Sequence, residues 1–200
     1  MTAIKICGIT RDADAALAAS LGAHALGFVL WPGSPRYIPL ARVRTIVAGL
    51  PPFVTPVGVF VDPTAGALAE AASAGIRLAQ VHGMPPASAP LPVLRAVHLR
   101  GNENGLDVEV GLVDTVLLDA HDPVSHGGTG KTIDWTRAAA VAARRPIVLA
   151  GGLTPLNVRE AIATVRPYAV DVASGVESAS GIKDPLKLRA FMDAVRGNST

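Results

Sequence analysis

Residues with acid–base chemistry stand directly after short apolar runs of this sequence. Cys7 closes the first such run, and Asp119 closes a later run of Val and Leu residues. A thiolate can remove a proton and a carboxylic acid can supply one, so these two side chains are a candidate general base and general acid. His82 and His98 close further runs, and Arg36 lies a few residues beyond another. Each residue alone also fits a core or wall position, so the prediction depends on the set.

Two glycine-containing pairs follow later apolar runs and could bind a phosphate group. Gly151–Gly152 comes after one run, and Ser174–Gly175 comes after the next. Glycine lets backbone N–H groups approach an anion closely. The sequence therefore predicts a phosphate site on these two loops, with ordinary strand-to-helix turns as the alternative.

A third glycine-rich segment, residues 126–132, ends like the phosphate-binding loop of nucleotide hydrolases. That motif, G-x-x-x-x-G-K-[ST], needs a glycine where Ser125 stands, and residues 120–124 separate the segment from the apolar run before it. Nucleotide hydrolysis is therefore disfavoured. We expect instead a loop that closes over a substrate and excludes water.

The elements that must position these residues follow from an alternation of short β-branched runs with Ala-rich segments. This alternation is typical of βα units whose parallel sheet is buried on both faces. We expect eight strands, at Ala3–Cys7, Ala25–Leu30, Val54–Val61, Leu78–His82, Val93–His98, Val113–Asp119, Pro146–Ala150 and Val170–Ala173. Helices are expected to begin at Asp12, Leu40, Thr64, Trp135, Pro155 and Pro185, with Asp134, Thr154 and Asp184 as N-terminal caps.

Eight βα units favour an α/β fold of the closed (β/α)8 or TIM-barrel type over an open doubly wound sheet. Residues 83–111 are rich in Pro, Gly and Asn, and leave room for only short fourth and fifth helices. No low-complexity linker divides the chain, so we expect a single (β/α)8-barrel catalytic domain over residues 1–200. Such a barrel carries its chemistry at the C-terminal ends of its strands and often binds phosphate on loops seven and eight. The candidate residues occupy these positions.

Composition disfavours several classes of function. Half of the 200 residues are hydrophobic, enough for a core without disulfides or metals. No signal-peptide pattern opens the chain and no apolar run reaches the ~20 residues that span a bilayer, so we expect a soluble, unprocessed protein with no membrane partner. The net charge is only +2, the basic residues are dispersed and aromatics make up 4%, so no nucleic-acid partner is expected. The single cysteine suits the reducing cytoplasm.

A series of short motifs resembles the phosphoribosylanthranilate isomerase family over essentially the whole chain. The ordered set is specific, whereas any single member would be a weak signal. The matching segments are Lys5–Thr10, Ser34–Ile38, Gly58–Val61, Gln80–Gly83, Gly127–Thr132, Ala150–Leu153 and Asp171–Glu177.

The resemblance implies an isomerase of tryptophan biosynthesis, which converts N-(5-phosphoribosyl)anthranilate to 1-(2-carboxyphenylamino)-1-deoxyribulose 5-phosphate by an Amadori rearrangement. It implies a small sugar-phosphate substrate, no cofactor and no metal. By the same resemblance Cys7 is the base, Asp119 is the acid and Arg36 binds the anthranilate carboxylate. The loops at Gly151–Gly152 and Ser174–Gly175 bind the phosphate.

Three further points accompany the resemblance. His82 lies in one of the matching segments and is grouped with the substrate-binding residues. Ala173 stands where the family commonly has a serine; this change is harmless if backbone N–H groups bind the phosphate, and it lowers affinity if that hydroxyl does. The oligomeric state stays open between a monomer and a dimer, with the monomer favoured.

The chemistry of this reaction requires the same residue types. Opening the ribose ring needs a proton on the ring oxygen, which suits Asp119 if burial raises the pKa of its carboxyl group. Removing the proton at C2 needs a base, and Cys7 can serve only as a thiolate. The pKa of Cys7 must therefore fall, or nearby cations and N–H groups must support the thiolate. Arg36 offers two parallel donors to a carboxylate.

Other functions on the same fold are weaker hypotheses. An isomerase of the histidine pathway would act on another aminated ribose phosphate, but its relatives commonly carry a carboxylate where Cys7 stands. A non-catalytic phosphate-binding barrel would lose Cys7 or Asp119, and both are present. A metal-dependent epimerase is disfavoured because the second strand ends in Leu30–Gly33, which offers no ligand.

The barrel also predicts one ion pair beneath the candidate base. Lys5 shares the parity of Cys7 in strand one, and Asp171 shares that of Ala173 in strand eight, so both side chains should point inward. Strands one and eight are neighbours in a closed barrel. We expect Lys5 and Asp171 to pair, because an unpaired buried charge would be strongly destabilising.

Overall fold

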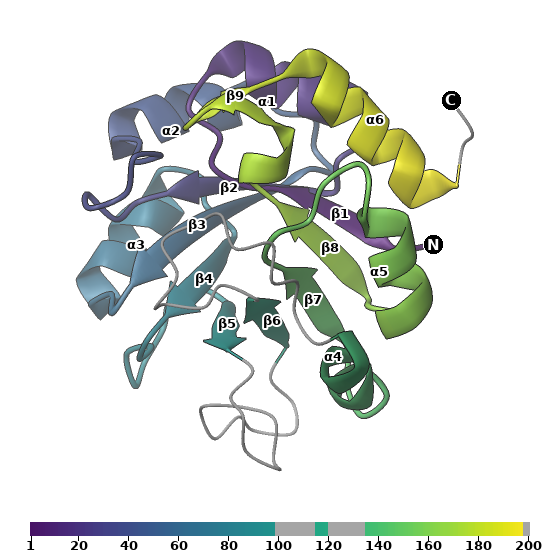
Figure 1. Ribbon diagram of the computed structural model, residues 1–200. Coiled ribbons are helices and arrows are strands. Elements are labelled where there is room, and N and C mark those ends of the chain that lie inside the picture. The colour runs from purple at the N-terminus through teal and green to yellow at the C-terminus, as the bar shows by residue number, and fades with distance from the viewer. Residues whose placement is uncertain (99–114, 120–134, 198–200) are drawn as a thin grey trace.

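Eight parallel strands close into one barrel in the computed structural model, which describes residues 1–98, 115–119 and 135–197 (Figure 1). Each strand pairs with the next along the chain, and β8 pairs with β1. The strands are β1 Ala3–Ile6, β2 Ala25–Val29, β3 Thr55–Val61, β4 Leu78–His82, β5 Val93–His98, β6 Val116–Asp119, β7 Ile147–Ala150 and β8 Ala169–Val172. The expected barrel and all eight expected strands are confirmed, with ends that shift by up to three residues.

Six helices and one small hairpin surround the barrel in the described part of the chain. The helices are α1 Asp12–Ser20, α2 Leu40–Ala48, α3 Ala65–Ser73, α4 Trp135–Ala142, α5 Val158–Val165 and α6 Pro185–Arg196. After β8 the chain forms a 3-10 turn, η1 (Ser174–Val176), and an antiparallel hairpin of β9 (Glu177–Ala179) and β10 (Ile182–Lys183). Asp184 caps α6 as expected, because its carboxylate accepts from the backbone N–H groups of Leu186 and Lys187.

The start of α5 differs from the prediction. A helix from Pro155 capped by Thr154 was expected, but α5 begins at Val158 after a turn. Asn157 closes this turn: its Oδ1 accepts from Thr154 N at 2.8 Å, and its Nδ2 donates to Gly152 O at 2.9 Å. The amide therefore fixes the β7–α5 loop, and the helix starts one turn later than the proline indicates.

The connection from β4 to β5 also differs. Residues 83–92 form turns and bends without a helix, where a short fourth helix was expected. Four prolines lie in this stretch, and each lacks an N–H and disfavours helical geometry in the residue before it. The expected fifth helix, the glycine-rich segment at residues 126–132 and the cap Asp134 lie outside the described residues.

Apolar side chains pack in two layers. Alternate strand residues such as Ile4 and Leu118 point outward and form one large core with helix residues such as Leu188. Residues of opposite parity fill the barrel interior, where Leu94, Leu117, Val148, Ala150 and Ala169 pack together. Lys5, Cys7 and Asp119 have the same parity in their strands as these interior residues. Their side chains therefore point into the barrel.

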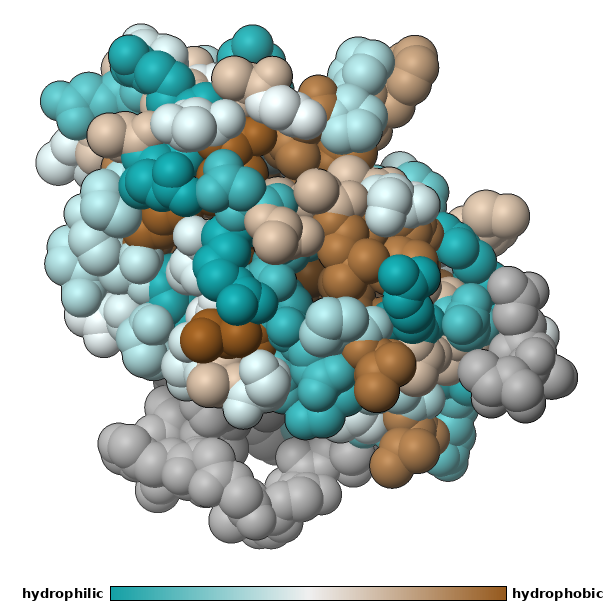
Figure 2. Space-filling view, turned by 90° about the horizontal axis from the view of Figure 1, so that it is seen from above, coloured by the Kyte–Doolittle hydropathy of each residue, from teal (hydrophilic) through white to brown (hydrophobic). Residues whose placement is uncertain are grey.

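The outer surface mixes hydrophilic and hydrophobic residues. The face over α1, α2 and α6 shows the two kinds interspersed (Figure 2). Within the described residues, every helix is too short or too polar to cross a bilayer.

Candidate active site

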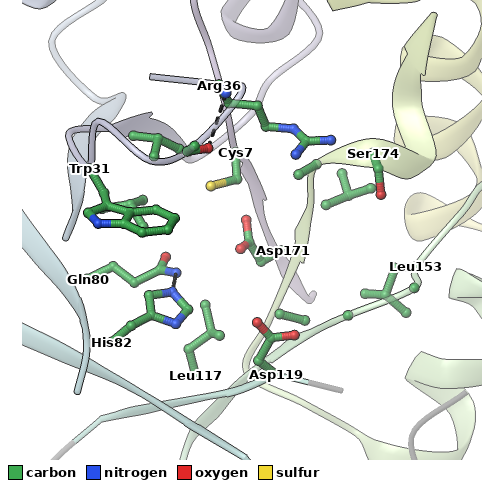
Figure 3. Close-up of a pocket in the computed structure, with 18 of the residues that line it drawn as sticks. Cys7, Trp31, Arg36, Gln80, His82, Leu117, Asp119, Leu153, Asp171 and Ser174 are labelled. Atoms are coloured by element: carbon green, nitrogen blue, oxygen red, sulfur yellow. Dashed lines mark hydrogen bonds between the residues drawn. The ribbon is translucent and has the colours of Figure 1, made fainter. Parts of the chain in front are cut away.

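A cavity of about 440 Å³ opens at the C-terminal ends of the strands. This volume is in the range of pockets that hold small ligands. Its lining includes seven residues expected from the sequence: Cys7, Arg36, His82, Asp119, Gly151, Gly152 and Ser174. Gly175 follows Ser174 in η1. The strand ends therefore bring the predicted set to one place (Figure 3).

The candidate base and acid enter the cavity from different sides of the barrel. Cys7 follows β1 and Asp119 ends β6, and Figure 3 shows their side chains facing the cavity with Asp171 between them. The Cys7 side chain is buried and packs beside Val29 and Val59. Asp119 is only partly buried, less than the sequence analysis expected. Both side chains line the same cavity.

An ion pair lies beside Cys7 in the barrel interior. Lys5 Nζ donates to Asp171 Oδ1 at 2.9 Å, and both side chains are less than a tenth exposed, which confirms the expected pair. Gly27 on β2 leaves room for it: a Cβ there would lie 2.7 Å from Cys7 Sγ and 3.1 Å from Lys5 Nζ. The thiol and the ammonium group therefore converge on the space above Gly27.

Burial and these charges act against each other on Cys7. Burial raises the pKa of the Cys7 thiol, while Lys5 and Lys183 lower it and Asp171 raises it further; the net direction is upward. Burial also lowers the pKa of Lys5, but Asp171 and Cys7 more than offset this effect, so Lys5 stays protonated. The expected supporting cations are therefore present, although they do not make the thiol more acidic than an ordinary cysteine.

The loops after β7 and β8 expose backbone N–H groups. Gly151 and Gly152 have φ of 86° and 64°, values that favour glycine. Gly175 packs against the first loop so closely that a Cβ would lie 1.9 Å from Leu153 O. Among the described residues, the N–H groups of Gly152, Ser174 and Gly175 donate no hydrogen bond to the protein. They remain available to an anion such as a phosphate.

Arg36 lines the cavity, but part of its guanidinium group is already hydrogen-bonded within the protein. Its Nε donates to both oxygens of Glu177, at 3.0 and 3.1 Å, and its Nη2 donates to Oε2 at 2.7 Å. Hydrogen bonding to Glu177 raises the pKa of Arg36, which stays charged. A substrate carboxylate must therefore use the opposite edge of the guanidinium, formed by Nη1 and the second Nη2 proton.

Glu177 and Lys183 belong to the site and escaped the sequence analysis. The Lys183 side chain is fully buried, and its Nζ donates to Glu177 Oε1 at 2.8 Å, Cys7 O at 2.5 Å and Ala173 O at 3.3 Å. Burial would raise the pKa of Glu177, but hydrogen bonds from Arg36 and Lys183 outweigh it and lower the pKa. The signals in the sequence were that Glu177 ends the matching segment Asp171–Glu177 and that it lies two residues beyond the expected phosphate loop.

Gln80 and His82 form a second pair that faces the cavity. The Gln80 amide nitrogen lies 3.0 Å from His82 Nε2. This contact is a hydrogen bond between the two side chains, and its direction depends on the tautomer of the imidazole. Gln80 is buried, and within the described structure its Oε1 has no hydrogen-bond partner. The contact with Gln80 therefore holds His82 at the cavity wall.

The remaining candidates give less information. His98 ends β5 opposite Asp119 in the strand register, but its side chain lies outside the described part of the structure. Where the structure is described, no group of three His, Cys, Asp or Glu residues could hold a metal ion.

Known proteins share this sequence and fold. The family model for N-(5'-phosphoribosyl)anthranilate (PRA) isomerase matches residues 4–194. The N-(5'-phosphoribosyl)anthranilate isomerase of Chromohalobacter salexigens is 48% identical, with 97% of this chain and 94% of the relative covered.

Solved structures agree with this match. Phosphoribosyl anthranilate isomerase from Thermotoga maritima has a TM-score of 0.86 at 40% identity, with 98% of this chain and 100% of that chain covered. A structure of the enzyme in complex with reduced 1-(o-carboxyphenylamino)-1-deoxyribulose 5-phosphate has a TM-score of 0.83 at 37% identity, with the same coverage of both chains. The sequence match and the shared barrel lead to the same conclusion: the chain belongs to the N-(5'-phosphoribosyl)anthranilate isomerase family.

Proposed function

We propose that this protein converts N-(5-phosphoribosyl)anthranilate to 1-(2-carboxyphenylamino)-1-deoxyribulose 5-phosphate in tryptophan biosynthesis. The observation that carries the proposal is the arrangement around one cavity. A thiol and a carboxyl group face it from β1 and β6, an arginine edge lies beside the thiol, and unpaired backbone N–H groups lie on the loops after β7 and β8. These groups match the two ends and the reacting centre of the substrate.

In this proposal Asp119 donates a proton to the ring oxygen, and the bond from C1 to that oxygen breaks. The anilino nitrogen supplies the electron pair, which gives an open-chain iminium ion. The Cys7 thiolate then removes the proton at C2, and the electrons of that C–H bond form the C1–C2 double bond of an enolamine. Transfer of the enol proton and protonation of C1 give the amino ketone. The steps need only proton transfers and no external oxidant or reductant.

The other residues hold the substrate during these steps. Arg36 binds the anthranilate carboxylate through its Nη1 edge, and Gly151, Gly152, Ser174 and Gly175 bind the phosphate. His82, fixed by Gln80, contacts the sugar from the wall of the cavity. Binding at both ends brings C2 and the ring oxygen to the two catalytic groups, which converts binding energy into orientation.

One chain supplies every residue in this scheme, so we propose that a monomer is sufficient for activity. Cys7 can act as the base only while it stays reduced, so we expect the protein to act in the reducing cytoplasm. Activity per chain should stay constant on dilution to concentrations where any dimer has dissociated.

The test is the fluorescence assay with purified protein, in which phosphoribosylanthranilate loses its fluorescence as it is converted. We expect turnover without added cofactor or metal, also after treatment with a chelator. The aminated ribose phosphate of histidine biosynthesis serves as the comparison substrate and should be converted more slowly. Folded protein that leaves phosphoribosylanthranilate unchanged would overturn the proposal.

A further inference from the structure

Glu177 is a buried carboxylate that binds two cations at once, one of which, Arg36, lines the cavity. It begins β9, directly after η1, and its side chain is 4% exposed. Oε1 accepts from Lys183 Nζ at 2.8 Å and from Gly181 N at 3.2 Å, and Arg36 donates to both oxygens. The proposed acid–base chemistry gives this residue no direct part. Its contacts nevertheless reach the residue that should bind the substrate carboxylate.

The geometry of the Arg36 contact decides which way the guanidinium faces. Nε and one Nη2 proton are directed at Glu177, so the guanidinium is held side-on in one orientation. The guanidinium plane is rigid, so this contact also fixes the direction of the Nη1 edge. Figure 3 shows the guanidinium between Cys7 and Ser174, at the cavity. Without Glu177 the long side chain could adopt several rotamers.

Lys183 in turn fixes Glu177. It lies on β10, and its buried Nζ contacts the carbonyl oxygens of Cys7 and Ala173 as well as the glutamate. The carboxylate is therefore tied to the ends of β1 and β8, next to the base and the phosphate loop. This makes Glu177 a rigid support for Arg36.

The charges of the cluster leave room for one more anion. Arg36 and Lys183 share the single carboxylate of Glu177, so the cluster has one more cation than anions. Among the described residues, the two other buried carboxylates nearby each have a cation of their own: Asp171 pairs with Lys5, and Asp14, which also accepts from the backbone N–H of Lys183, pairs with Arg11. A carboxylate bound on the outer edge of Arg36 would balance the excess charge.

We propose that Glu177 is a positioning residue for the substrate: it holds Arg36 side-on, so that the opposite edge of the guanidinium is aimed at the aromatic carboxylate. The inference rests on the proposed function, in which Arg36 binds that carboxylate. Glu177 thereby contributes to the choice of substrate without contacting it.

The test compares two ligands on the full-length protein. One is the reduced product analogue, 1-(o-carboxyphenylamino)-1-deoxyribulose 5-phosphate after reduction, and the other is the same molecule without the aromatic carboxylate. The ratio of their dissociation constants, measured by calorimetry, reports only on recognition of the carboxylate. If Glu177 had only a structural role, its replacement would weaken the binding of both ligands equally and leave the ratio unchanged.

Glu177→Gln is the first variant. The amide keeps the shape but has one acceptor oxygen, so its NH₂ group must face either Arg36 or Lys183. We expect the preference for the carboxylate-bearing ligand to fall by about tenfold or more, the effect of misplacing a charge-assisted contact. Affinity for the ligand without the carboxylate should change less than about threefold, and KM should rise more than kcat falls.

Glu177→Asp is the second variant, for use if the amide leaves a buried cation unpaired and the protein fails to fold. It keeps a negative charge beside both cations and withdraws the carboxylate from Arg36 by one methylene, so it should lower the ratio in the same direction. Lys187→Met is the matched control. It removes a hydrogen bond to the backbone oxygen of Glu177 without touching its carboxylate, and it should leave the ratio at the wild-type value.

Failure of this inference can be told apart from failure of the proposed function. If Arg36→Ala abolishes the preference while both Glu177 variants keep it, Glu177 does not position Arg36 and the inference is wrong. If the wild-type protein does not prefer the carboxylate-bearing ligand, or if Arg36→Ala keeps that preference, Arg36 does not bind the carboxylate. The proposed role of Arg36 is then wrong, independently of Glu177.

Discussion

Lys5 and Asp171 form a buried ion pair across the seam where β1 meets β8, with 2.9 Å between Nζ and Oδ1. The two residues are direct partners in the strand register, and both point into the barrel interior. Cys7 follows two residues after Lys5 on the same side of the strand. The seam of the barrel thus holds its charged pair directly beneath the proposed base.

The first prediction concerns this pair. Lys5→Met leaves Asp171 buried without its cation, so we expect the free energy of unfolding to fall by about 3–5 kcal/mol. In Lys5→Met/Asp171→Leu no charge is stranded, and most of the loss should be recovered. Urea unfolding of the two single variants and the double variant gives the coupling energy. Additive losses would show that the two charges do not interact.

The second prediction tests Cys7 as the base. Cys7→Ser should lower kcat by at least ~10²-fold with little change in KM, because a hydroxyl is a far weaker acid than a thiol. Since burial raises the pKa of Cys7 and only the thiolate can act as the base, kcat/KM of the wild-type protein should rise from neutral into alkaline pH. A flat or falling profile there, or a serine variant with a tenth of the wild-type kcat, would exclude this role.

The third prediction tests Asp119 as the acid. Asp119→Asn keeps the shape of the side chain and loses the transferable proton, so kcat should fall by at least ~10²-fold. Because Asp119 is not assigned to either end of the substrate, affinity for the reduced product analogue should stay near the wild-type value. Binding that weakens together with kcat would assign Asp119 to substrate binding instead.

The fourth prediction concerns Arg36. Arg36→Ala removes a charge-assisted contact that exists before and during the reaction, so KM should rise strongly while kcat changes much less. Steady-state kinetics on folded protein, checked by thermal unfolding, separates the two constants. A loss confined to kcat would contradict binding of the substrate carboxylate.

The fifth prediction places the phosphate. In crystals soaked in phosphate or sulfate, the anion should lie within hydrogen-bond distance of the backbone N–H groups of Gly152 and of Ser174 or Gly175. Ala173→Ser should then change phosphate affinity only slightly, since these donors belong to the backbone. Density for the anion only at residues 127–130 would instead revive the nucleotide-loop hypothesis for that segment.

The sequence predicted those features that local patterns determine. Eight apolar runs of strand length placed eight strands, and parity within two of them predicted the Lys5–Asp171 pair from neighbouring strands of a closed barrel. Asp184 was recognisable as a cap because its own carboxylate binds the next N–H groups. The start of α5 was missed because the side-chain amide of Asn157, the third residue of the predicted helix, binds the backbone of the preceding loop.

Glu177 and Lys183 could not be predicted by these means. They lie on a short hairpin after β8 that has no helical or strand periodicity of useful length. Both are charged, and charged residues at such positions are ordinarily exposed. Their burial depends on Arg36, Cys7 and Ala173, which come from distant parts of the chain. Seven of the residues that line the cavity were therefore predicted from the sequence, whereas the pair that supports Arg36 came only from the three-dimensional structure.

The contact between Lys183 Nζ and the carbonyl oxygen of Cys7 joins residues 176 positions apart. During synthesis on the ribosome the proposed base is made 176 residues before the side chain that anchors its backbone. A nascent chain that stalls before Lys183 has every other proposed catalytic and substrate-binding residue and still cannot complete the site. Closing so long a loop costs conformational entropy, and contacts between distant residues form slowly during folding. We therefore expect the site to form only after the chain through Lys183 has been made.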